Sequence, residues 1–123
     1  MENENIEEAT IAVEAQFKAY NARNIKSFAE CFSEDVVVTK EGVEKPLLIG
    51  IEDFTNYYRG IFEASPQLHA RLIGRRVEWP YVYDHEEVSG RAETNSIIQA
   101  EARYKISKGK ISEVHFRYLN RSE

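Results

Sequence analysis

A change in the spacing of apolar residues near Pro66 constrains the fold of this 123-residue chain more than any other feature. Before Pro66, apolar residues recur three and four positions apart, which is the spacing of one face of an α-helix. After it, apolar and polar residues alternate with a period of two, as in β-strands that have one buried face. The sequence therefore predicts one α+β domain over residues 1–123, with three N-terminal helices packed in a curved antiparallel sheet.

The helical half divides into three segments and one strand. The first helix is expected over about residues 5–22. A short second helix begins at Asn24, whose side chain is a favoured N-terminal cap. The β-branched run 36–39 predicts a strand. The third helix opens at Gly50 and ends before Pro66, because a proline disfavours helical backbone in the residue that precedes it.

Four long strands are expected in the second half, over residues 68–79, 81–89, 96–107 and 110–119. All four exceed the usual five or six residues, and long strands twist strongly. The last two strands place apolar side chains on one face and charged side chains on the other. The sheet should therefore curve around the helices with its apolar face inward.

Three motifs in this order resemble the nuclear transport factor 2-like superfamily, in particular its SnoaL-like and ketosteroid-isomerase-like branch. They are the helix-turn-helix-strand opening at residues 20–36, the helix start at 50–54 and the closing hairpin at 104–116. The resemblance implies a cone-shaped barrel with a pocket between helices and sheet, and often a homodimer formed through the outer sheet face. It does not imply one activity, because members of the superfamily include isomerases, cyclases, dehydratases, hydrolases and binding modules.

The ketosteroid isomerases allow a residue-by-residue test of this resemblance. They use a tyrosine and a protonated aspartate as oxyanion donors, and a second aspartate to shuttle the proton. This chain has Gln16 at the position of the tyrosine and Lys40 at that of the base. The late aspartate corresponds to Ala102, or to Glu101 if the hairpin has no gap. Two of the three roles are empty, so steroid isomerisation by that mechanism is not expected.

Composition narrows the classes of partner. A net charge of −5 disfavours nucleic acid, and no run approaches the roughly 20 apolar residues of a membrane span. The acidic start is unlike a secretory signal, and the lone Cys31 fits a reducing cytoplasm. His69, His85 and His115 are too scattered for a metal motif, and no phosphate-binding glycine loop is present. We therefore expect a cytoplasmic protein without metal or cofactor that binds a small apolar molecule.

The run Asp84-His85-Glu86, in the middle of a predicted strand, is the candidate catalytic cluster. Side chains alternate along a strand, so Asp84 and Glu86 share a face with two valines while His85 points the other way. If the valine face is inner, two carboxylates enter an apolar cavity and their pKa values rise. If the other face is inner, His85 enters alone as a proton shuttle. The sequence leaves both alternatives open.

Aromatic residues on inward positions supply the expected pocket and core. The predicted pocket lining comprises Phe17, Tyr20, Phe54, Tyr57, Tyr58, Arg75, Trp79, Ala102, Tyr104 and Phe116. The predicted core comprises Phe17, Phe28, Phe32, Phe54, Phe62 and Phe116. Arg75 lies among apolar residues, so we expect it to pair with Asp84 across the Pro80 turn or else to hold an anionic ligand.

Two functions from different classes fit this sequence. The first is an isomerase, dehydratase or cyclase that transfers a proton on an apolar substrate, with Asp84, His85 or Glu86 as the acid or base. The second is a ligand-binding or dimeric interaction module without catalysis. A cavity with an ionisable group in its wall favours the first, whereas a closed and wholly apolar cavity favours the second.

Overall fold

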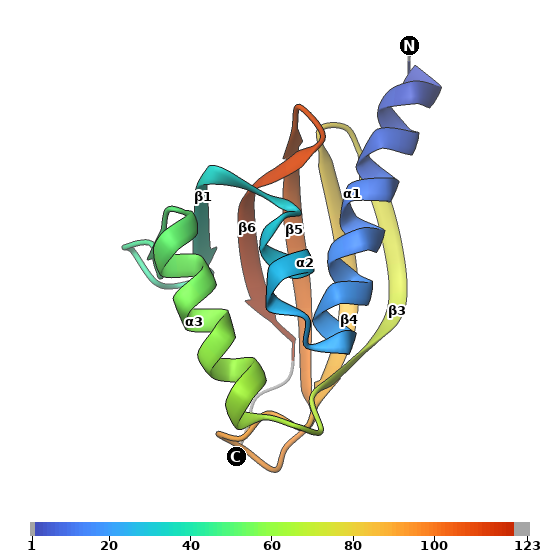
Figure 1. The fold of residues 1–123 in the computed structure, drawn as a ribbon. Helices are drawn as coiled ribbons and strands as arrows, with labels where there is room; N and C mark the ends of the chain where they lie inside the picture. The colour runs from blue at the N-terminus through green and yellow to red at the C-terminus, as the bar shows by residue number, and fades with distance from the viewer. Residues whose placement is uncertain (1, 120–123) are drawn as a thin grey trace.

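A computed structural model describes residues 2–119, with side chains from residue 5 onward. Helices and strands follow the predicted order closely (Figure 1). They are α1 (Glu2–Ala22), α2 (Ile25–Ala29), β1 (Phe32–Lys40), β2 (Leu48–Ile49), α3 (Ile51–Ala64), β3 (His69–Glu78), β4 (Tyr81–Ser89), β5 (Ile98–Ser107) and β6 (Lys110–Tyr118). No helix among the described residues is long and apolar enough to cross a bilayer.

Local chemistry explains where the helices begin. The side chain of Asn24 accepts a hydrogen bond from the Ser27 backbone N–H at 3.1 Å, so the predicted cap of α2 is confirmed. Gly50 precedes α3 with φ of 88°, a conformation that disfavours a side chain. The short helix α2 ends at Ala29, and Phe32 is the first residue of β1.

The sheet contains six strands in the order β2-β1-β6-β5-β4-β3. The four long strands pair antiparallel as predicted, but β1 runs parallel to β6, so the sheet is mixed. The parallel pairing is possible because β1 and β6 are joined through α3 and four intervening strands rather than by a hairpin. The sheet does not close on itself, so the cone is an open curved sheet with β2 and β3 at its edges.

All three helices lie on the concave face of the sheet (Figure 1). Aromatic rings fill the space beneath α2 and α3, and Phe28 has its ring centroid within 5.8 Å of five other rings. Four of the six predicted core phenylalanines are buried: Phe28, Phe32, Phe54 and Phe62. Phe17 and Phe116 are only half-buried.

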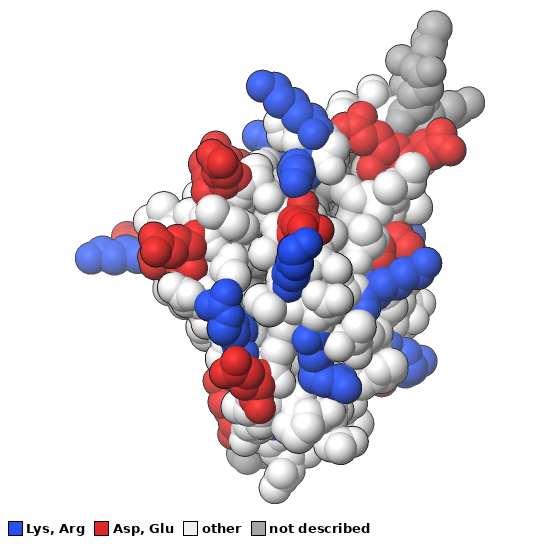
Figure 2. Space-filling model, in the orientation of Figure 1, with Lys and Arg blue, Asp and Glu red and all other residues white. Residues whose placement is uncertain are grey.

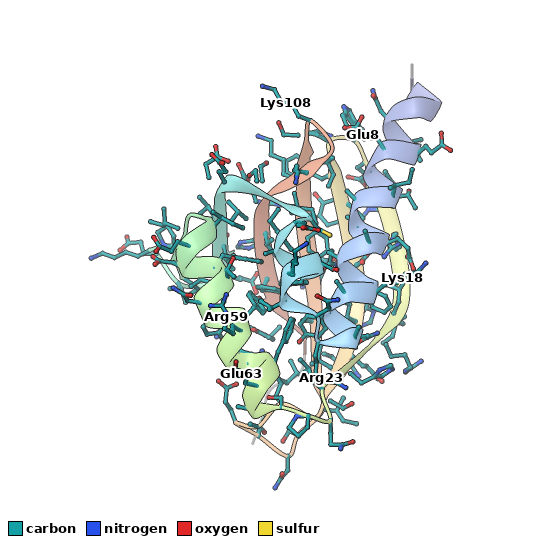
Figure 3. All side chains as sticks on the ribbon, viewed as in Figure 1. Glu8, Lys18, Arg23, Arg59, Glu63 and Lys108 are labelled. Atoms are coloured by element: carbon teal, nitrogen blue, oxygen red, sulfur yellow. The ribbon has the colours of Figure 1, made fainter. Side chains whose placement is uncertain are left out.

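The outer surface of the helical layer carries charges of both signs. Figure 2 shows lysine, arginine, aspartate and glutamate side chains interspersed across this face. Lys18 on α1 and Arg59 on α3, both labelled in Figure 3, are exposed. The apolar part of the layer therefore faces the sheet, and a cavity lies between them.

Candidate functional site

Burial along β4 decides which face of that strand points inward. Val82, Asp84, Glu86 and Val88 are buried against the helices, and the alternate residues are half-buried on the outer face. Asp84 is 0% exposed and Glu86 is 8% exposed. His85 lies on the outer face, where its Nε2 is 3.4 Å from Gln99 Oε1. Of the two alternatives that the sequence leaves open, the structure has the one with two inward carboxylates.

Asp84 is held in an ion pair, as the sequence predicted. Arg75 lies directly opposite it on β3, donating from Nε to Oδ1 at 2.7 Å and from Nη2 to Oδ2 at 2.9 Å. The third guanidinium nitrogen, Nη1, donates to Glu14 on α1 at 2.9 Å. Burial raises the pKa of Asp84, and the two hydrogen bonds from Arg75 oppose that rise. This network ties α1 to the sheet, and it does not line the cavity.

A cavity of about 330 Å³ lies between the helices and the sheet. Most of its walls are aromatic or aliphatic, and seven of the ten predicted lining residues contribute: Phe17, Tyr20, Phe54, Tyr57, Tyr58, Tyr104 and Phe116. The prediction was wrong for the other three. Arg75 is held in its pair with Asp84, and Ala102 has a methyl group that its neighbours cover completely. Trp79 lies in the turn after β3 and is 39% exposed.

Glu86 is the carboxyl group that reaches the cavity wall. Tyr104 on β5 donates its hydroxyl hydrogen to Glu86 Oε2 at 3.3 Å, and Gln16 Nε2 on α1 donates to the Tyr104 hydroxyl oxygen at 3.3 Å. Burial raises the pKa of Glu86 to about 7, and the negative charge of Asp84 adds to the rise, while the Tyr104 hydrogen bond opposes it. A carboxyl group with this pKa exchanges a proton readily at neutral pH.

Arg91 borders the same cavity at its exposed rim, and the sequence analysis did not identify it. Its Nη2 donates to the Tyr57 hydroxyl at 3.1 Å and to Glu93 Oε1 at 2.7 Å. Arg91 follows Gly90, where φ is +80° and an added Cβ would collide with the Gln67 backbone. The sequence feature that could have identified Arg91 is its position directly after the glycine that ends a long predicted strand.

Two of the positions compared with ketosteroid isomerases also acquire a structural role. Gln16 is 4% exposed and lines the cavity, where its amide supports Tyr104. Lys40 places its ammonium group 4.8 Å from the centroid of the Tyr118 ring. Within residues 2–119, no three histidine, cysteine, aspartate or glutamate side chains gather as a metal ligand set. The chemistry that this arrangement can perform is proton transfer by a carboxyl group.

Comparisons with known proteins give one family and many similar folds. The family model described as a SnoaL-like domain matches residues 13–114. An uncharacterised cystatin-fold protein from Novosphingobium aromaticivorans has a TM-score of 0.77 at 24% identity, covering 91% of this chain and 96% of that one. No curated protein matches the sequence significantly.

Two further solved structures have still higher TM-scores at lower identity. A proposed ketosteroid isomerase from Kribbella flavida has a TM-score of 0.82 at 13% identity, covering 97% of this chain and 83% of that one. An LEH-like epoxide hydrolase from M. tuberculosis has a TM-score of 0.80 at 13% identity, covering 93% of this chain and 84% of that one. At these identities the likeness establishes the fold and not the reaction.

Proposed function

The chain belongs to the SnoaL-like domain family, and we propose that it is an enzyme that moves a proton on an apolar small molecule, with Glu86 as the acid–base group. The reaction is of isomerase, dehydratase or cyclase type. The observation that carries the proposal is a carboxyl group in the wall of an apolar cavity, with its pKa raised by burial to about 7. Such a group is populated in both protonation states at neutral pH.

The proposed chemistry requires no reagent beyond the substrate and this side chain. The Glu86 carboxylate removes a proton from a carbon next to a carbonyl group, and the electron pair moves onto the carbonyl oxygen. In a substrate that has a C=C bond next to that carbon, the same carboxyl group then returns the proton to the far carbon of the C=C bond. The electron pair moves back from the oxygen and the double bond shifts, which completes an isomerisation. Tyr104 holds the carboxyl group in place, and Gln16 holds Tyr104. Both are therefore positioning residues.

The other two members of the candidate cluster receive different roles in the proposal. Asp84 is paired with Arg75 and acts on Glu86 through its charge, which raises the pKa of Glu86. His85 faces away from the cavity, so the proposal gives it no part in the reaction. The names of two similar structures, an epoxide hydrolase and a proposed ketosteroid isomerase, support small-molecule processing as the class of function.

A probe that reports any carboxylate base in an apolar pocket tests this proposal without a known substrate. The probe 5-nitrobenzisoxazole loses the proton on its C3, its N–O bond breaks, and the coloured product 2-cyano-4-nitrophenolate forms. We expect the protein to accelerate this reaction, with a rate that increases as the pH rises through about 7, because the base form of Glu86 is required.

Substitutions then assign the base. Glu86→Gln should abolish the acceleration, and Glu87→Gln, on the outer face of the same strand, should leave it unchanged. Tyr104→Phe should shift the pH profile, because the hydroxyl group stabilises the carboxylate. An equal rate in the wild type and in Glu86→Gln would reject the proposal and favour a binding module that uses the cavity only to hold a ligand.

A further inference from the structure

We propose that Arg91 is the anion-binding residue of the pocket, and that the natural ligand is an amphipathic organic anion. The ligand would place its apolar body among the aromatic walls and a carboxylate or similar group against Arg91. This inference rests on the proposed function, because it names the substrate class for the same cavity. The inference goes beyond the proposed function because it assigns a second polar group, Arg91 at the rim, which binds the ligand and does not react with it.

The hydrogen bonds of Arg91 leave part of its guanidinium group available. Nε and Nη2 donate to Glu93 Oε1 at 3.1 and 2.7 Å, and Nη2 also donates to the Tyr57 hydroxyl. Nη1 has no protein acceptor within the described part of the chain. Because no fully buried side-chain nitrogen or oxygen there lacks a partner, Nη1 must contact open space. An arginine fork with a free side can receive a carboxylate.

Glu93, the carboxylate that pairs with Arg91, is exposed to solvent. The Arg91 side chain is 17% exposed, whereas that of Glu93 is 61% exposed. Ion pairs with a strongly exposed partner contribute little, because water screens them. An anion that enters the cavity would meet Arg91 from its less exposed, aromatic side, where charges interact more strongly.

Three neutral hydroxyl groups lie within electrostatic range of the same cation. Tyr20, Tyr58 and Tyr118 all line the cavity, and the charge of Arg91 lowers the pKa of each against the larger rise caused by burial. These three phenols therefore lie within electrostatic reach of the guanidinium and stay protonated. A carboxylate beside Arg91 would have hydroxyl donors nearby and no ionised competitor among these three.

The surroundings of Arg91 are more exposed than those of Glu86, the other polar group of the cavity. Arg91 contacts Tyr57, which is 42% exposed, whereas Gln16 and Tyr104 beside Glu86 are each 4% exposed. The loop that carries Arg91, residues 90–97, crosses the lower end of the molecule near the end of α3 (Figure 1). A ligand would therefore bind with its anionic group toward the rim and its reacting carbon toward the buried carboxyl group.

A matched pair of probes tests the anion site independently of catalysis. The probes are 2-naphthoate and 2-naphthamide, which have the same apolar body but differ in charge, and calorimetry measures their dissociation constants at neutral pH. We expect the wild type to bind 2-naphthoate about tenfold or more tightly than the amide, because a charge-assisted hydrogen bond replaces a neutral one. Arg91→Gln should bring the ratio close to one while it keeps 2-naphthamide binding.

A control variant and two contrary outcomes complete the test. Arg59→Gln removes an equal charge from the exposed face of α3 and should keep the wild-type ratio (Figure 3). A wild-type ratio near one would overturn the inference. Loss of both probes in Arg91→Gln would also overturn it, since Arg91 would then serve only to hold the loop. If Glu86→Gln keeps the preference while no variant shows base activity, the proposed function fails and the anion site stands.

Discussion

Asp84 and Glu86 lie on the same buried face of β4, two residues apart, yet they differ in their neighbours. Asp84 receives two hydrogen bonds from Arg75, which also contacts Glu14 on α1. Glu86 receives one hydrogen bond from a neutral hydroxyl and borders the cavity. The comparison teaches that burial alone does not make a carboxyl group an acid–base catalyst. In the function that we propose, the presence or absence of a paired cation separates the structural carboxyl group, Asp84, from the one that transfers a proton, Glu86.

The largest expected effect comes from removing Arg75, the cation that pairs with Asp84. Arg75→Met leaves Asp84 without its main cation at a position that is 0% exposed, and removal of one partner from a buried pair typically costs about 3–5 kcal/mol. Chemical denaturation should therefore show a large loss in the free energy of unfolding. Arg76→Met, on an exposed arginine of the same strand, should leave the midpoint nearly unchanged. A stable Arg75→Met variant would mean that Asp84 needs no partner.

The aromatic layer offers a second contrast, between a fully buried ring and a half-buried ring. Phe54 is 1% exposed and lies against other rings, so Phe54→Ala should cost about 3–5 kcal/mol. Phe116 is only half-buried, so Phe116→Ala should cost clearly less. Urea unfolding of both variants measures the difference. A loss below about 1 kcal/mol for Phe54→Ala would contradict its place in the core.

Glu86, which has no paired cation among the described residues, should make the free energy of unfolding depend on pH. The pKa of Glu86 is about 7 in the folded protein and 4.5 in its ordinary state, so the folded protein binds the extra proton between these values. Glu86 therefore adds stability below about pH 4.5, and this is lost as the pH rises through about 7. The pKa difference corresponds to about 3 kcal/mol.

The Glu86→Gln variant isolates that contribution. Its free energy of unfolding should increase relative to the wild type as the pH rises from about 5 to about 8, because the variant has no carboxyl group to ionise. Glu87→Gln on the outer face is the matched control. Parallel curves for Glu86→Gln and the wild type would show that Glu86 titrates alike in the folded and unfolded chain, and the contrast with Asp84 would lose its meaning.

The smallest expected effect concerns the outer face of the sheet, which no described helix covers (Figure 1). We propose a homodimer there, formed around Gln99, Glu101, Arg103, His115 and Arg117. Because these side chains are polar, the association should vary with salt. Light scattering at micromolar concentration should give twice the chain mass of 14.2 kDa, and a monomer mass would contradict the proposal.

The sequence by itself determined the order and the type of the main elements. Helical spacing, the Asn24 cap and the glycine before α3 placed the helices, and strict alternation placed the four long strands. Alternation also placed Asp84 and Glu86 on one face, and the Arg75 pair followed from proximity across the turn. These features depend on residues close in sequence, which is why a one-dimensional pattern contains them.

Only the tertiary structure decided which face of β4 is inner, because alternation fixes relative and not absolute orientation. It also decided that β1 joins β6 in parallel, and that Trp79 stays at the surface. The pocket also depends on the tertiary structure. Glu86, Tyr104 and Gln16 come from β4, β5 and α1, and their meeting depends on how three elements pack. A site assembled from distant segments leaves no periodic mark in any one of them, so its chemistry becomes visible only when the chain is folded.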